Sequence, residues 1–292
     1  MSVVLVGAVA ISFSGILYRL AEVSPTTGAF FRCFWALPAL WLLARAEDRR
    51  YGARTQRSRT LAWAAGAFFA ADLILWHNAI EQVGAGLATV LGNTQVVLVP
   101  LLAWLLLRER PAATTLAAIP IVATGVLLIS GVLEDGAYGA NPALGAVFGI
   151  LTGIAYAGFL LTLREGNRDD RRPAGPLFDA TFASMIGCAA YGLVTDDLDL
   201  SPSLEATFWL IVLALSSQVL GWLLISISLP RLPAALSSVM LTLQPACSVV
   251  FAAILVDESP SELQLLGVVA ILAGLIFATA RRREVPQPEP AG

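Results

Sequence analysis

The sequence has no lysine, a single histidine and three cysteines, and charged residues make up only 13% of its 292 residues. Soluble domains of this size carry about a quarter charged residues, so the composition argues strongly against a water-soluble enzyme. Cys33, Cys188 and Cys247 each lie inside an apolar run, without the spacing of a disulfide framework or a metal site. We therefore expect the thiols to behave as small apolar side chains, and we expect no metal and no cofactor.

Long apolar runs are what the sequence has instead. Apolar residues make up 57% of the chain, and the mean hydropathy is +0.77. A helix needs roughly 20 apolar residues to cross the hydrocarbon core of a bilayer, and its backbone must be hydrogen-bonded within the segment. We therefore predict an all-α integral membrane protein with ten transmembrane helices. They are expected at residues 3–20, 25–44, 61–81, 84–107, 114–132, 142–163, 176–194, 204–227, 233–256 and 262–280.

The arginines predict how these helices are oriented. All 18 basic residues are arginine, and 16 of them lie in the tail or in the loops that follow even-numbered spans, whereas the opposite loops are acidic. The positive-inside rule then places both termini in the cytoplasm. We expect a multi-pass protein of the plasma membrane, specifically a bacterial inner membrane, without a cleaved signal peptide because no basic leader precedes the first span. Arginines spread over several loops argue against nucleic acid as a partner.

The two halves of the sequence resemble each other. Residues 7–18 (GAVAISFSGILY) match residues 145–156 (GAVFGILTGIAY) at six of twelve positions. The fourth and ninth spans match at a constant shift of 149, which pairs Gln95 with Gln244 and Glu109 with Glu258. A unit of five spans is odd, so its second copy enters the membrane upside down, as in the inverted repeats of secondary transporters. We predict a first repeat over residues 1–132, an external linker over 133–141, a second repeat over 142–280 and a disordered cytoplasmic tail over 281–292.

Several short motifs carry a resemblance to a known family. They are FFRCFWALPAL in the second span, LLLRERP and ILVDESP at the ends of the fourth and ninth spans, and glycines in the fifth and tenth spans. With the paired ten-span layout, the chain resembles the EamA-type members of the drug/metabolite transporter superfamily over essentially its whole length. The resemblance implies two inverted five-helix halves around a central cavity, and export or import of small metabolites. The family often has proline partway along the fourth span, whereas here Val96 follows Gln95 and only the ninth span keeps the proline, at Pro245.

Ionisable side chains inside the predicted spans are the first candidates for a site, because a charge in lipid is costly and marks function by default. Asp72 is expected either to face a cavity, where it binds a substrate amine or a proton, or to hydrogen-bond a neighbouring helix. His77 either senses protons or packs; it lies five residues from Asp72, about 140° around a helix, so we expect no contact between them. Arg32 either binds a substrate carboxylate, or pairs with Glu81 or extends to the surface.

Amides and aromatic side chains in the spans form a second group of candidates. Gln95 and Gln244 occupy equivalent positions of the two repeats, Asn93 lies near the first of them, and Gln218 lies in the eighth span. Equivalent amides of inverted halves would meet near the midplane, where they either bind substrate or hydrogen-bond each other. Aromatic side chains that are candidates for a cavity wall, with packing as the alternative, are Tyr18, Trp76 and Tyr156.

Together these features predict a secondary transporter that moves small organic metabolites or drugs by alternating access. Its expected partners are the small-molecule substrate and the lipid bilayer, and the sequence leaves the oligomeric state open. The resemblance favours export, and proton coupling would run through Asp72 or His77. Import of a metabolite is the alternative within transport, and a non-transporting receptor or scaffold is the alternative outside it. A single histidine without a paired carboxylate motif disfavours an intramembrane enzyme, and the lack of a Walker motif disfavours ATP as the energy source.

Overall fold

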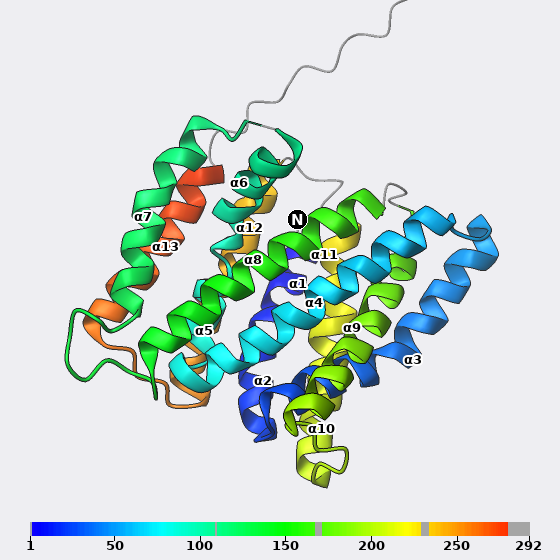
Figure 1. Cartoon of the computed structure of the whole chain (residues 1–292), viewed down its shortest axis with the longest axis horizontal. Coiled ribbons are helices and arrows are strands. Elements are labelled where there is room, and N and C mark those ends of the chain that lie inside the picture. The colour runs from blue at the N-terminus through cyan, green and yellow to red at the C-terminus, as the bar shows by residue number, and fades with distance from the viewer. Residues whose placement is uncertain (1, 109, 167–170, 229–233, 280–292) are drawn as a thin grey trace, which may run out of the picture.

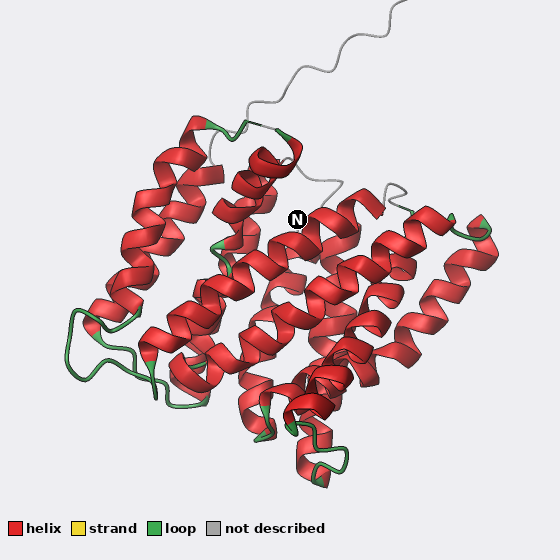
Figure 2. Ribbon diagram, in the orientation of Figure 1, coloured by secondary structure: helices red, strands yellow, loops and turns green. Residues whose placement is uncertain are grey.

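The computed structural model of the chain describes residues 2–108, 110–166, 171–228 and 234–279, and every regular element in these ranges is a helix (Figures 1 and 2). The first half contains α1 (Ser2–Ser12), α2 (Ser14–Ala21), α3 (Pro25–Tyr51), α4 (Gln56–Val83), α5 (Ala85–Gly92), α6 (Gln95–Leu107) and α7 (Ala113–Ile129). The second half contains α8 (Pro142–Gly166), α9 (Ala174–Thr195), α10 (Leu204–Leu213), the π-helical segment η1 (Ala214–Gly221), α11 (Trp222–Ser228), α12 (Ala234–Leu255) and α13 (Glu262–Thr279).

The helices have the length and composition of membrane spans. Among the described residues, seven helical stretches are long and apolar enough to cross a bilayer, and three shorter apolar helices lie where the first, fifth and ninth spans were predicted. Large apolar side chains such as Leu105, Val147 and Val250 are exposed on the outside of the bundle, as expected where lipid replaces water. The all-helical membrane architecture is therefore confirmed, whereas the count of ten spans stays a prediction.

Three of the predicted spans are not single α-helices. The first divides at Phe13, and the fourth divides at Asn93 and Thr94, between α5 and α6. The hydroxyl of Thr94 donates to the carbonyl of Leu91 (2.7 Å) and the amide of Asn93 to that of Thr89 (2.8 Å), and such local bonds compete with the regular helical ladder. The eighth span changes from α to π geometry in η1, a change that is frequent at functional sites.

The last helix of each half packs against its counterpart, and the two run antiparallel. Gln264 at the start of α13 donates to the carbonyl of Ile129 at the end of α7 (3.3 Å), and α7 and α13 lie together at the left of Figure 1. Further along, a Cβ on Gly125 would lie 2.7 Å from the carbonyl oxygen of Gly267. Only glycine permits this approach of two backbones, which is how many membrane helices associate.

The pair formed by α3 and α9 is also antiparallel and is tied at both ends by carboxylates. Asp197, just after α9, accepts the N–H of Thr26 at the start of α3 (3.1 Å). Glu47, near the end of α3, accepts the N–H groups of Ala174 (2.9 Å) and Gly175 (2.8 Å) at the start of α9. Each carboxylate therefore accepts backbone N–H donation that has no acceptor within the partner helix, and it complements the positive end of that helix.

Candidate functional site

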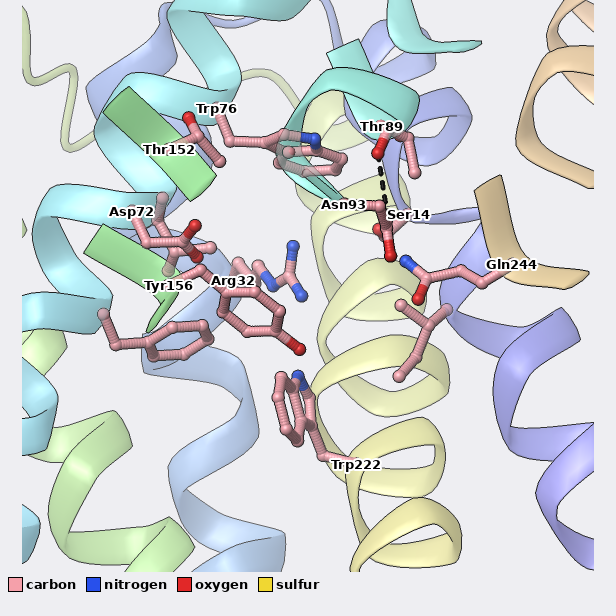
Figure 3. Close-up of a pocket in the computed structure, with 14 residues that line it drawn as sticks. Ser14, Arg32, Asp72, Trp76, Thr89, Asn93, Thr152, Tyr156, Trp222 and Gln244 are labelled. Carbon is pink, nitrogen blue, oxygen red and sulfur yellow. Dashed lines mark hydrogen bonds between the residues drawn. The ribbon is translucent and has the colours of Figure 1, made fainter. Parts of the chain in front are cut away.

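A small polar cavity lies inside the bundle, with a solvent-accessible volume of about 60 Å³, the room of a few water molecules. Both halves build its wall: α1 to α5 contribute from the first half, and α8, α11 and α12 from the second. Its charged, aromatic and neutral polar side chains, most of them labelled in Figure 3, are Arg32, Asp72, Phe69, Trp76, Tyr156, Trp222, Ser14, Thr89, Asn93, Thr152 and Gln244.

Arg32 brings a cation into this cavity from α3. The side chain is only 4% exposed, its Nε donates to the amide oxygen of Gln218 (3.1 Å), and its guanidinium lies 5.6 Å from the ring centroid of Trp76. Among the described residues, no carboxylate lies within the 4 Å of an ion pair with it, and Figure 3 shows the guanidinium directed toward the middle of the cavity. A buried arginine with free N–H donors presents the fork that binds a carboxylate.

Asp72 brings a carboxyl group into the same cavity from α4. It is 7% exposed, and the described part of the chain supplies neither a hydrogen-bond donor nor an ion-pair partner to its carboxyl group. In Figure 3 the carboxyl group turns toward the side of the cavity that holds Arg32. The side chain is therefore left to interact with whatever occupies the cavity.

Gln218 lies behind Arg32 rather than in the cavity wall. It is fully buried on η1, and besides accepting from Arg32 it donates through Nε2 to the hydroxyl of Thr181 on α9 (3.2 Å). Its neighbour Ser217 is also fully buried and donates to the carbonyl of Ala10 (3.1 Å). The wider π turn rotates each residue by less than the 100° of an α-helix, so two consecutive polar side chains both face the interior.

Four other sequence candidates do not line the cavity. His77 is fully buried, its Nδ1 lies 2.7 Å from the carbonyl of Leu73, and its ring packs edge-on against Tyr18 at 4.3 Å. The hydroxyl of Tyr18 lies within hydrogen-bond distance of Glu81 (2.9 Å), so Glu81 is engaged there and not with Arg32. Gln95 is buried at the start of α6.

Comparison with known proteins supplies the context of this cavity. The EamA-like transporter family model matches residues 1–131 and again residues 143–280. The chain belongs to the EamA-like transporter family. No curated protein matches the chain. One solved protein, described only as "Crystal structure of protein", has a TM-score of 0.64 with 15% sequence identity over 96% of this chain and 98% of its own, a likeness that shows the fold alone.

In this member of the family, the cavity lies where the two matched segments meet. Arg32, Asp72 and Asn93 come from the first segment, and Tyr156 and Gln244 from the second. Family members are transporters, and transporter sites typically form between repeats. The residues that the structure describes contain no group of three or more histidine, cysteine or acidic side chains that could hold a metal ion.

Sequence reasoning missed three hydroxyl groups of the cavity wall and one buried ion pair. The three hydroxyl groups belong to Ser14, Thr89 and Thr152. Thr89 precedes Asn93 by one helical turn, and Thr152 precedes Tyr156 by one turn. Helical spacing from these two sequence candidates could therefore have found both threonines. The ion pair joins Arg54 to Asp179 at 2.8 Å between the α3–α4 loop and α9. Nothing in the sequence relates these two residues.

Proposed function

We propose that the protein is a secondary transporter that moves small polar organic solutes across the membrane by alternating access, with the cavity as its substrate site. The observation that carries this proposal is that a buried guanidinium, Arg32, and a buried carboxyl group, Asp72, reach the same cavity without forming an ion pair with each other. Ionisable groups without a partner inside a membrane protein are expensive. A ligand that compensates them would account for their position.

The arrangement of the helices supports two inverted repeats. The last helices of the halves run antiparallel, and so do α3 and α9. Shortly after α6 and α12 the chain adopts left-handed backbone at Arg108 (φ 59) and Asp257 (φ 53), two residues that differ by the repeat shift of 149. Antiparallel counterparts that end in the same way are what an inverted duplication of five spans produces.

The chemistry of the wall supports roles for individual residues. Arg32 binds a carboxylate of the substrate, Asp72 binds an amine or a proton, and the amides of Asn93 and Gln244 hydrogen-bond its polar groups. Of the two groups considered for proton coupling, Asp72 opens to the cavity, whereas His77 is enclosed by Tyr18 and its own helix. We therefore assign coupling to Asp72. We further propose export, cytoplasmic termini and a bacterial inner membrane location, with import of a metabolite as the alternative.

Counterflow in proteoliposomes tests the proposed function. The purified protein should exchange internal for external labelled solute when pools of amino acids, nucleosides, sugars and organic cations are offered. Arg32→Ala should abolish exchange, and Asp72→Asn should remove the response to an imposed pH gradient. Glu22→Gln, an exposed acidic residue outside the cavity, serves as the matched control and should exchange normally. Failure of every pool, with a protein that remains folded, would remove the proposal.

A further inference from the structure

Glu258 makes an unusual contact between the two halves. It follows α12 and is only 3% exposed, yet the described residues give it no ion-pair partner. Its two carboxylate oxygens instead accept the N–H groups of Ala85 (2.5 Å) and Gly86 (3.0 Å), the first two residues of α5. One carboxylate from the second half therefore caps the N-terminus of a helix of the first half.

The residues around this cap are adapted to it. Gly84 has φ +87, and a Cβ there would lie 2.8 Å from the carboxylate of Glu258. A Cβ on Gly86 would lie 2.9 Å from the Cα of Val249 on α12. Asp257 adopts left-handed backbone (φ 53) and turns the chain back immediately before Glu258. The two glycines leave the space in which the carboxylate meets the helix end.

The helix that Glu258 caps also forms part of the cavity wall. Helix α5 has eight residues, a length of about 12 Å, and Thr89, Gly92 and Asn93 at its far end line the cavity. Ser248 of α12 donates to the hydroxyl of Thr89 (3.2 Å). Behind α5 the chain breaks at Asn93 and Thr94 before α6 begins. A short segment thus joins the Glu258 cap to the cavity and ends at an interruption of the helix.

We propose that α5 is a gate that closes the cavity on the side of the membrane where the α12–α13 loop lies. Glu258 holds α5 in the closed position, and loss of this cap lets α5 tilt about Asn93 and Thr94. This inference rests on the proposed function, because a gate matters only if the cavity opens to that side. Transporters typically build their substrate sites from discontinuous helices, around which one part of the bundle moves against the other. The α3–α9 pair, which is capped at both ends, has no such break in α3 or α9 and serves as the fixed support.

Cysteine accessibility tests the gate without requiring transport. The reporter is a cysteine introduced in the cavity wall as Ser14→Cys. The partly exposed Cys247 is removed as Cys247→Ala, whereas Cys33 and Cys188 can stay because they are fully buried. A membrane-impermeant methanethiosulfonate is applied from the Glu258 side or from the opposite side. Glu258→Gln should raise labelling from the Glu258 side about fivefold, the change in an opening equilibrium that loss of a helix cap brings. Glu262→Gln, an exposed glutamate in the same region, should leave the rate unchanged.

A cross-link provides the second variant if Glu258→Gln does not fold. The hydroxyls of Thr89 and Ser248 are 3.2 Å apart, so Thr89→Cys with Ser248→Cys should form a disulfide with an added oxidant and fasten α5 to α12. The oxidised protein should lose counterflow by at least tenfold and regain it on reduction, whereas undiminished exchange in the oxidised state would overturn the gate. Equal labelling rates of the Ser14→Cys reporter with and without Glu258→Gln would also overturn the gate. If labelling responds but no solute exchanges, the gate stands and the transport function falls.

Discussion

Replacement of Gln218 by leucine tests how the cavity holds its cation. Gln218 is fully buried and accepts from Nε of Arg32 at 3.1 Å, while its own amide group donates to Thr181 at 3.2 Å. Leucine has a similar size and lacks both polar groups. The substitution therefore leaves Nε of Arg32 without its acceptor and lets the guanidinium leave the position from which it faces the cavity.

The size of the effect follows from these two bonds. Hydrogen bonds between transmembrane helices contribute about 0.6 to 1.7 kcal/mol, and a bond to a charged donor lies at the upper end. Loss of the bond between Gln218 and Arg32 should weaken substrate binding about tenfold, which corresponds to about 1.4 kcal/mol. Thr181→Val removes only the acceptor for Gln218 and should weaken binding about threefold. Thr181→Ser keeps the hydroxyl and is the matched control.

Binding is measured as ligand-induced thermal stabilisation, with a transported carboxylate solute and with its carboxamide analogue. If Gln218 positions Arg32, Gln218→Leu weakens binding of the carboxylate and leaves binding of the carboxamide nearly unchanged, because only the carboxylate needs the guanidinium. Equal loss for both ligands would mean that Gln218 supports the whole cavity. Unchanged binding of both would refute the reasoning, since Arg32 would then hold its position without this bond.

Three further predictions concern contacts outside the cavity. Asp179→Asn should lower the melting temperature, because it leaves buried Arg54 without the anion 2.8 Å away, a loss of about 3 kcal/mol for a broken buried pair. Gly125→Leu should also lower it, since a Cβ at Gly125 already meets the carbonyl of Gly267 at 2.7 Å. Burial raises the pKa of the Glu258 carboxyl, against the lowering effect of the Gly86 and Ala85 N–H groups and of Arg19. As the pH on the Glu258 side of the membrane falls through this pKa, the carboxylate is protonated and caps α5 more weakly. Labelling of Ser14→Cys from that side should therefore rise.

Each of these changes has a control in the same region. Asp48→Asn should have a smaller effect than Asp179→Asn, because Asp48 lies 4.0 Å from Arg54 with a side chain 43% exposed. Ala117→Leu places the same bulk on an exposed face of α7 and should leave the melting temperature unchanged. The pH response should vanish in Glu258→Gln, because the tyrosine and arginine side chains that also face Glu258, Tyr138 and Arg19, keep their protons in acid. A response that persists in Glu258→Gln would contradict its assignment to Glu258.

The class of the fold was predictable from the sequence, whereas the helix breaks were not. Apolar residues at 57% and ten long runs predict membrane helices, and the family resemblance is confirmed by the match to both halves. Residues 84–107 nevertheless form one apolar run that contains two helices. In such a run no polar face marks where a helix ends. The break depends on Asn93 and Thr94, which look like ordinary polar residues of a span.

Charge was the signal that led to the cavity, and helix rotation decided which other candidates reach it. Arg32 and Asp72 stand out in any apolar span, and both line the cavity. His77 lies five residues after Asp72, about 140° around the same helix, and faces Tyr18 instead. The rotation of a helix cannot be read from a segment that is apolar on all sides. Thr89 escaped notice because hydroxyls are common in such helices and bond their own backbone, as this one does to Ala85.

Two helices of this protein begin with the same dipeptide and receive the same kind of cap. Ala85-Gly86 opens α5 and Ala174-Gly175 opens α9, and in each case a glutamate of the opposite half accepts both N–H groups. Antiparallel counterparts favour such contacts, since the end of one helix lies beside the positive start of the other. The caps differ in burial, since Glu47 is half-buried and Glu258 is only 3% exposed, and they differ further in their mechanical setting. Helix α9 is 22 residues long and its pair with α3 is also capped at the other end, whereas α5 has eight residues and a break behind it. The same kind of cap therefore belongs to a pair tied at both ends in one case, and in the other to the short segment that, in the proposed gate, moves when Glu258 releases it.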